Sequence, residues 1–381
     1  MSKTELLFCG DFVISEGISY QKNNINSCVL DMFKSSDFNV VNLECPVTDA
    51  TNSNKINKTG PHLKGNSNDI EKILKELKID LVTLANNHVL DYGKKGLKDT
   101  INFCNSNNIN HLGAGENLNS SNKAFRKKIN GINISILNFA ENEWSSAKEN
   151  EAGANPLDVI DNVEQIKEEK NNTDIVIVII HGGHEFYSLP NPRMVKQYRY
   201  YADNGADLII GHHPHCISGS EVHNGTPIHY SLGNFIFTKP SKYADWYTGL
   251  ILKVVIDKDK KISCEPIPTF QDKTDYSIKL HKEENKKNVL KSIENYSNII
   301  KDKSKLKEEW NKYVALKSDT YLNIFSPLTF INNNLLRAIF YKIKVYKFIK
   351  SKNTLKLYLN LMRCEAHSDL SKAIIEKKIK K

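Results

Sequence analysis

The chain has 381 residues, of which 40% are hydrophobic, enough to bury the core of one large domain and a smaller region. Its longest aliphatic run covers residues 175–180, far below the roughly 20 apolar residues of a membrane-spanning helix. The seven cysteines are an odd number without CxxC spacing, which argues against a disulfide framework and a thiolate zinc site.

The first residues, MSKTELLFCGD, contain a short apolar run that an aspartate closes. A secretory signal needs about 7 to 15 apolar residues and a small-residue cleavage site. We therefore expect a cytoplasmic protein.

The formal net charge of +9 is distributed unevenly. Residues 281–381 contain 23 Lys/Arg and 10 Asp/Glu, a net charge of +13, whereas residues 1–280 carry a net charge of −4. Glycine is absent after residue 280, and Lys, Asn, Leu and Ile recur there at helical spacing. We therefore predict a main domain over residues 1–280 and a basic helical region over residues 281–381.

Short apolar runs alternate with amphipathic segments between residues 4 and 250, a pattern typical of βα units and an α/β fold. The predicted strands are 4–9, 38–43, 79–85, 132–140, 173–180, 206–211 and 228–233. Helices are predicted over 67–78, with Ser67 or Asn68 as N-cap, and over about 191–204, with Pro192 near the first turn. Residues 251–268 are predicted to form a closing β-hairpin.

Polar side chains directly follow five of the predicted strands. In α/β sheets the ligand site lies outside the carboxyl ends of the strands, so we expect the five clusters to converge on one crevice. The clusters are Asp11; Asn42 and Glu44; Asn87, His88 and Asp91; His181 and Glu185; and His212, His213 and His215.

Carboxylate, amide and imidazole donors suit Mn, Fe, Zn or Mg better than a soft, thiolate-bound ion. Two such ions about 3.5 to 4 Å apart, bridged by a carboxylate, would clamp a phosphoryl oxygen and generate hydroxide at neutral pH. The pattern therefore predicts one or two divalent metal ions.

Each cluster alone has a simpler explanation. Asp11 could cap a helix or a turn, His88 could be a buried structural histidine, and Asn86 and Asn87 could form an ordinary turn. However, five of the 12 histidines lie between residues 181 and 215, directly after predicted buried strands. Unpaired polar groups are costly there, so a convergent site is favoured. We expect His184 and His212 to be supporting or surface residues.

Seven ordered motifs resemble those of the CapA family, which is named for capsule (poly-γ-glutamate) synthesis. They are GD at 10–11, VVNLECPVT at 40–48, LANNHVLDYG at 84–93, HLGAGEN at 111–117, HGGHE at 181–185, GADLIIGHHPH at 205–215 and IHYSLGNFIF at 228–237. The resemblance covers about residues 4–270. It implies similarity to calcineurin-like metallophosphoesterases, whose fold is a four-layer α/β/β/α sandwich with a two-metal site at the strand ends.

The resemblance also implies a role for each motif residue. The metal ligands would be Asp11, Glu44 in the bridging position, Asn87 on the second metal, and His181, His213 and His215. His88 would donate a proton to the leaving group, oriented by Asp91. Substrate binding is assigned to Asn42, Glu185 and Asn234.

Two residues depart from the phosphoesterase pattern. Val13 occupies a position where those enzymes usually have a histidine, and Glu44 stands where they usually have an aspartate; the CapA pattern shares both departures. A single metal ion or a chemistry other than phosphatase therefore stays open. Capsule-type CapA proteins commonly carry an N-terminal membrane anchor, which we do not expect here because the first predicted strand begins at about residue 4.

Residues 333–363 mix Lys and Arg with Leu, Ile, Phe and Tyr. Basic amphipathic helices can lie on anionic membranes or dock on a partner, which would make the protein peripheral to the inner face of the membrane. The favoured alternative is a Lys-rich helical subdomain that packs its apolar face on the main domain. Nucleic-acid binding is not expected, because no recognised motif accompanies the charge.

Two functions fit these observations. The first is a metal-dependent hydrolase that cleaves a phosphoester or an amide in the biosynthesis of a cell-surface polymer. The alternative is a non-catalytic component of a capsule-synthesis assembly that uses the crevice to bind an anionic polymer.

Overall fold

Strand β9 (Ile175–His181) is apolar on both faces, and its two faces belong to different hydrophobic cores. In the computed structural model, which describes residues 3–324, 328, 331–345, 348, 352–363 and 375, Ile177 and Ile179 lie in one core. Val176, Val178 and Ile180 lie in another. The continuous aliphatic run is therefore a strand covered on both sides, as its composition predicts.

The strands form two large sheets and one small one. The eight-stranded sheet has the order β16 (Ile278–Leu280), β15 (Ile262–Gln271), β14 (Thr248–Ile256), β1 (Thr4–Val13), β2 (Phe38–Leu43), β3 (Leu81–Thr83) and β4 (Asn110–Leu112), with β13 (Asn234–Phe237) beside β1. The six-stranded sheet has the order β11 (Ser220–His223), β12 (Thr226–His229), β10 (Leu208–His212), β9, β7 (Ile132–Ala140) and β6 (Phe125–Ile129). Strands β5 (Ala114–Gly115) and β8 (Gly153–Ala154) pair separately.

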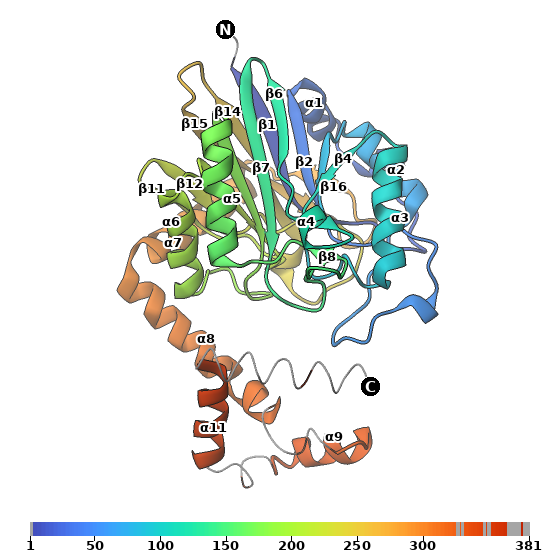
Figure 1. The fold of residues 1–381 in the computed structure, drawn as a ribbon, viewed down its shortest axis with the longest axis vertical. Coiled ribbons are helices and arrows are strands. Elements are labelled where there is room, and N and C mark those ends of the chain that lie inside the picture. Colours follow the sequence, from blue (N-terminus) through green and yellow to red (C-terminus); the bar gives the residue numbers. More distant parts are fainter. Residues whose placement is uncertain are drawn as a thin grey trace. The chain divides into compact units, whose positions relative to one another are not determined.

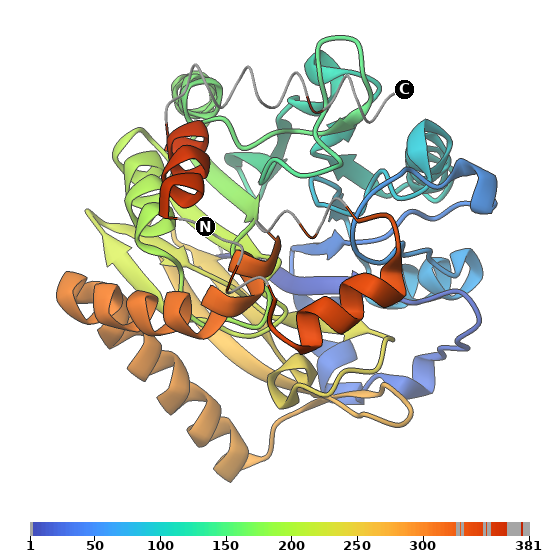
Figure 2. The same cartoon turned by 90° about the horizontal axis from the view of Figure 1, so that it is seen from below.

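Helices cover the outer faces of both large sheets (Figure 1). They are α1 (Ser27–Ser35), α2 (Ser67–Glu76), α3 (Gly93–Ser106), α4 (Leu118–Ser121), α5 (Val159–Asn172) and α6 (Pro192–Asp203). Seen from below, the green helices α5 and α6 lie on the opposite side of the strands from the blue and cyan helices α2 and α3 (Figure 2). Short 3₁₀ helices cover Lys22–Asn24, Asn52–Asn54 and Ala244–Tyr247.

Three hydrophobic cores lie between the four layers. The first joins α1, α2 and α3 to the eight-stranded sheet, the second lies between the two sheets, and the third joins α5 and α6 to the six-stranded sheet. This arrangement confirms the predicted four-layer α/β/β/α sandwich.

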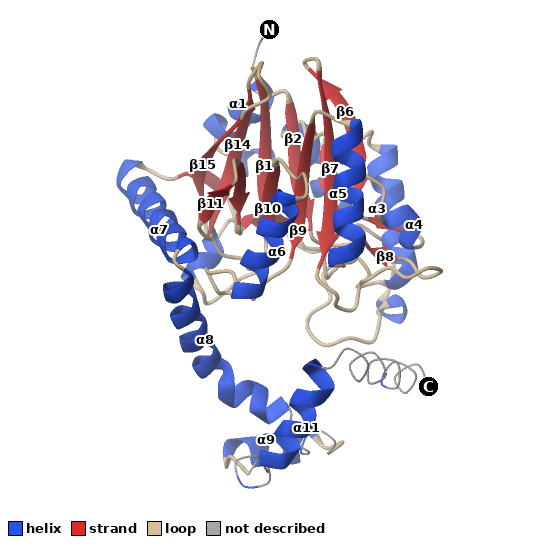
Figure 3. Ribbon diagram, turned by 60° about the vertical axis from the view of Figure 1, so that its left-hand side comes forward, coloured by secondary structure: helices blue, strands red, loops and turns tan. Residues whose placement is uncertain are grey.

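The C-terminal helices are α7 (Glu283–Lys301), α8 (Lys303–Ile324), α9 (Asn334–Lys342) and α11 (Lys352–Arg363). The chain divides into two compact units, residues 1–306 and 307–381. Helix α7 belongs to the first unit, where it packs beside β11 and β15 (Figure 3). The division at residue 280 rests on composition and stays a prediction. No helix within the described ranges has both the length and the apolar composition to cross a membrane.

Two local predictions are wrong. Residues 228–233 do not form one strand, because β12 ends at His229 and residues 230–233 carry the chain from the six-stranded sheet to the eight-stranded one. The turn uses Gly233, whose φ of +67° suits glycine. The N-cap of α2 is Asn66, which accepts a hydrogen bond from the backbone N–H of Asp69, and not Ser67 or Asn68.

Candidate metal centre

Along one edge, strand β1 pairs first with β14 and then with β13, and the change occurs at Gly10, the residue before Asp11. It pairs with β14 through Thr4–Cys9 and with β13 from Asp11 onward, with a register shift at Asp11. A Cβ atom on Gly10 would lie 1.8 Å from the carbonyl oxygen of Gly233, so only glycine permits this approach. The shift places Asp11 at the carboxyl end of the sheet.

The Asp11 carboxylate is completely buried and is surrounded by donors. It accepts hydrogen bonds from Asn42 Nδ2 at 2.8 Å and from the His213 backbone N–H at 3.4 Å. His212 Nδ1 lies 3.5 Å away, and His215 Nδ1 lies 3.2 Å away. Burial acts to raise the pKa of Asp11, but hydrogen bonds and charge from His212 and His215 outweigh it and hold the pKa well below its usual range. Asp11 is therefore ionised.

Glu44 follows β2 and is also completely buried. Neither of its carboxylate oxygens has a hydrogen-bond partner among the described residues. The nearest site nitrogens are His181 Nε2 at 3.5 Å and His215 Nε2 at 3.7 Å. Burial and the negative charge of Asp11 raise the pKa of Glu44. A buried carboxylate with two unpaired oxygens is costly unless a cation balances it, so this residue fits a metal site.

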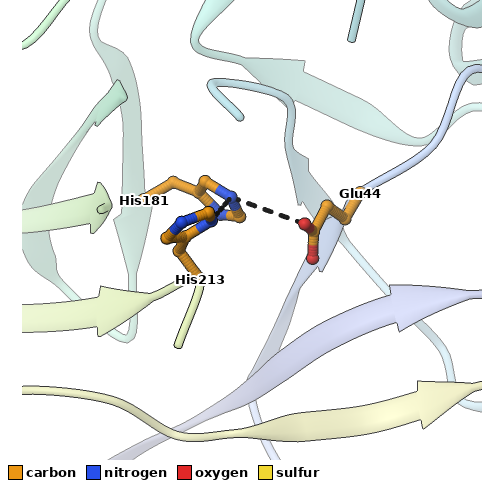
Figure 4. A group of neighbouring side chains, drawn as sticks. All are labelled: Glu44, His181 and His213. Carbon is orange, nitrogen blue, oxygen red and sulfur yellow. Dashed lines mark hydrogen bonds and ion pairs between the residues drawn. The ribbon is translucent and has the colours of Figure 1, made fainter. Parts of the chain in front are cut away.

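Two groups of side chains could hold a metal ion, and Glu44 belongs to both. Glu44, His181 and His213 form one group, and Asp11, Glu44 and His215 form the other. In each group the potential ligand atoms lie within 4.8 Å of one another. Figure 4 shows the first group, with the two imidazoles facing the carboxylate. The shared Glu44 is the position expected for a bridging carboxylate.

The histidines of the first group are neutral. His181 Nε2 lies 3.1 Å from both Asn87 Oδ1 and His213 Nδ1, and Asn42 Nδ2 lies 3.2 Å from His181 Nδ1. Burial, followed by the charges of neighbouring histidines, lowers the pKa of His181 well below its usual value and that of His213 to about 4. Neutral imidazole is the form that binds metal ions.

His215 is held in one orientation by its surroundings. Its Nδ1 lies 2.9 Å from Asn234 Oδ1, and its ring packs 4.8 Å from the Trp246 ring and edge-on to Phe237 at 5.2 Å, between ring centroids. Because Nδ1 faces two oxygen acceptors, the proton is placed on Nδ1 and Nε2 faces Glu44. His213 and His215 have φ of +96° and +54°. This backbone is unfavourable for both, and such strain clusters at functional sites.

A third set of polar side chains lies beside the two groups. His88 Nδ1 donates to Asp91 Oδ2 at 2.7 Å, which leaves Nε2 free of the Asp91 contact. Lys58 Nζ forms an ion pair with Asp91 and lies 3.3 Å from His88 Nδ1. Burial lowers the pKa of His88; Asp91 acts in the opposite direction, and the charge of Lys58 adds to the lowering.

The structure brings most of the predicted site residues together. Asp11, Glu44, Asn87, His181, His213 and His215 are buried at one end of the two sheets, with His88 and Asp91 beside them. His212, expected to be supporting, is buried against Asp11. Asn42 and Asn234 are buried and bond to site residues, whereas Glu185 is exposed and acts on Glu44 through its charge. The predicted roles in catalysis, metal ligation and substrate binding stay predictions.

Sequence reasoning missed Lys58 and Glu143. Lys58 lies in the loop between β2 and α2, where its surroundings NKINKTGPH look like solvated loop, yet its side chain is only 3% exposed. Glu143 follows β7 and hydrogen-bonds to Asn87. The strand-end rule would have found Glu143, since it comes three residues after β7 ends. No pattern in the sequence marks Lys58.

The segment of the chain that contains these site residues matches a known family. The family model described as "Bacterial capsule synthesis protein PGA_cap" matches residues 5–239, which contain every ligand of both groups. The chain belongs to this family. In this PGA_cap protein the matched segment includes β13, so β14, β15, β16 and the helices after residue 280 lie beyond it.

Individual relatives of this PGA_cap protein match large parts of the chain. It is 38% identical over 238 residues to the "PGA biosynthesis protein CapA" of Bacillus subtilis (strain 168), covering 60% of this chain but only 62% of that protein. It is 30% identical over 307 residues to the "Capsule biosynthesis protein CapA" of Bacillus anthracis, covering 74% of each. Among solved structures, a hypothetical protein from Thermus thermophilus matches with 15% identity and a TM-score of 0.44, over 70% of this chain and 98% of the other.

Proposed function

We propose that this protein is a metal-dependent hydrolase that cleaves a phosphoester or an amide during the biosynthesis of a poly-γ-glutamate-like cell-surface polymer. The observation that carries the proposal is the buried, unpaired carboxylate of Glu44, which is shared by two groups of metal-binding side chains. The names of the two Bacillus relatives support the biosynthetic context.

In this proposal Asp11, Glu44, Asn87, His181, His213 and His215 hold one or two divalent ions of the Mn, Fe, Zn or Mg type. When bound, such ions polarise the scissile group and lower the pKa of water. The bond from His215 Nδ1 to Asn234 and the contact of Asn42 with Asp11 keep these ligands oriented before any ion arrives.

His88 is the proposed proton donor to the leaving group. Its Nδ1–H is directed at Asp91 Oδ2, so Nε2 is the nitrogen that can exchange a proton with a substrate. Lys58 forms an ion pair with Asp91 and thereby lowers the proton affinity of that carboxylate, so the proton stays on His88. The proposed substrate-binding residues are Glu185, Asn42 and Asn234. Asn42 acts through Asp11, and Asn234 acts through His215.

The test compares metal-loaded wild-type protein with His88→Asn on a generic phosphodiester and a γ-glutamyl amide. We expect the variant to bind the same amount of Mn²⁺, measured by elemental analysis, but to lose about 10² to 10⁴ in kcat. His223→Asn is a matched control, since His223 pairs with Asp203 at the protein surface. If metal-loaded wild-type protein turns over neither substrate, the hydrolase proposal fails. Polymer output that survives His88→Asn in a producing cell would instead support the non-catalytic alternative.

A further inference from the structure

Residues 333–363 carry eight positive charges and no Asp or Glu. The cations are Arg337, Lys342, Lys344, Lys347, Lys350, Lys352, Lys356 and Arg363. Residues 346, 347 and 349–351 of this stretch lie outside the described residues, while α9 and α11 are described. A stretch this basic has no internal partner for its charge, so its counter-charge has to come from elsewhere.

Helix α9 exposes an apolar side to its surroundings. Leu335 is 73% exposed, Ile339 46% and Ile343, just after the helix, 59%. At 100° per residue these positions and Leu336 lie within an arc of about 100°. Lys342 follows one edge of the apolar side, and Arg337 lies on the opposite, polar side.

Helix α11 repeats this pattern. Leu357, Leu359 and Met362 are 57%, 49% and 55% exposed and fall on one broad apolar side. Lys352 and Lys356 are exposed and fall together on the other side. Each of the two helices therefore combines an exposed apolar side with a polar side that carries cations.

An anionic bilayer surface satisfies both requirements at once. Lipid tails cover exposed leucines, and anionic headgroups attract each nearby Lys or Arg. Helices of nine and 12 residues are about 14 to 18 Å long, so they can lie along a bilayer but cannot cross its core of about 30 Å. A second copy of the chain would bring eight further positive charges against the first eight, which opposes self-association through this surface.

We propose that helices α9 and α11 bind the surface of an anionic membrane through their apolar sides. The charge sets the preference for anionic lipid, and the leucine-rich sides set the depth of insertion. The binding is separate from the metal centre and does not depend on hydrolysis.

The proposal is tested by flotation of the full-length protein with phosphatidylcholine vesicles, with and without phosphatidylserine. The wild type should float only with the anionic vesicles, and less so as salt rises. Lys342→Gln, at the edge of the apolar side, should lower partitioning about fivefold, and Arg337→Gln, on the opposite side, should lower it less. Leu335→Glu combined with Ile339→Glu should abolish flotation, whereas the control Leu316→Glu, at an exposed apolar residue of α8, should float like wild type.

Equal flotation of wild type and the Leu335→Glu/Ile339→Glu variant would overturn the proposal, as would equal recovery with neutral and anionic vesicles. Circular dichroism of each variant checks that helix content is retained. Sedimentation of the same proteins without lipid tests the alternative that a second copy of the chain covers the apolar sides. If the wild type self-associates and the double variant does not, the surface is an interface between copies and the membrane proposal is wrong.

Discussion

Lys58 and Asp91 form an ion pair in which both side chains are almost completely buried. Asp91 also accepts hydrogen bonds from His88 and from the backbone N–H of Leu63, so one carboxylate ties the loop that carries Lys58 to the end of β3. Removal of either charge leaves the other buried without compensation, which costs about 3 to 5 kcal/mol in comparable pairs.

Lys58→Met is therefore expected to lower the free energy of unfolding by about 3 kcal/mol. The double variant Lys58→Met/Asp91→Asn should lose less than the sum of the two single variants, because it removes both charges. Equilibrium urea unfolding of the four proteins measures this coupling. Strictly additive losses would show that the two charges do not interact.

Glu44→Gln is expected to weaken metal binding without lowering the stability of the metal-free protein. Because burial and Asp11 raise the pKa of Glu44 in the folded chain, its ionisation disfavours folding above its ordinary pKa of about 4.3. A carboxamide avoids this penalty, so in EDTA the variant should melt at or above the wild-type temperature. Added Mn²⁺ should raise the melting temperature of the wild type but not of the variant. Glu71→Gln, on the surface of α2, is the control and should respond like wild type.

His229, the last residue of β12, is expected to make folding sensitive to acid. Burial lowers its pKa to about 4 in the folded chain, against about 6.5 unfolded. The stabilising contribution is complete above pH 6.5 and is lost as the pH falls towards 4, because only the unfolded chain takes up the proton in that window. His229→Gln should therefore reduce the loss of unfolding free energy between pH 6.5 and 4 by on the order of 3 kcal/mol. An unchanged pH profile in chemical denaturation would contradict this assignment.

Gly10→Ala is expected to damage both the fold and the metal centre. The new methyl group would overlap the carbonyl oxygen of Gly233 and push β13 away from β1 at Asp11. We expect a loss of roughly 3 kcal/mol in unfolding free energy and weaker Mn²⁺ binding. Gly131→Ala serves as comparison: its φ of +91° is strained for alanine but nothing lies within 4 Å, so a loss of only about 1 kcal/mol is expected. Equal losses would show that backbone strain, not the contact, dominates.

The sequence predicted the convergence of the site because that convergence follows from strand direction alone. Asp11 and His181 lie at the carboxyl ends of β1 and β9, Glu44 and His213 directly follow β2 and β10, and Asn87 follows β3 by four residues; the sandwich places those strand ends together. Lys58 could not be found this way, since it reaches the site from within a long loop. The left-handed backbone of His213 and His215 was equally hidden, because a positive φ is uncommon for residues other than glycine.

The break of the predicted strand 228–233 has a different cause. Tyr230–Gly233 are apolar enough to continue β12, but the chain leaves the sheet so that Asn234 can pair beside Asp11. Tertiary pairing overrides local propensity at this point. The same departure supplies Asn234 to His215, so the misread segment is the one that completes the support of that ligand.

The pairing of β1 with β13 joins the start of the family segment to its end. The metal centre is therefore expected to form late in folding. Contacts between such distant parts of a chain form slowly, because a long loop has to close first. A cation that needs Asp11, Glu44 and His215 together thus meets its full set of ligands only when residues 11 to 215 have assembled. Binding then adds its free energy only to states in which these ligands have come together. Ion uptake would therefore report the assembly of residues 11–215, and during synthesis a chain that ends before His215 would be expected to lack the full ligand set of this group.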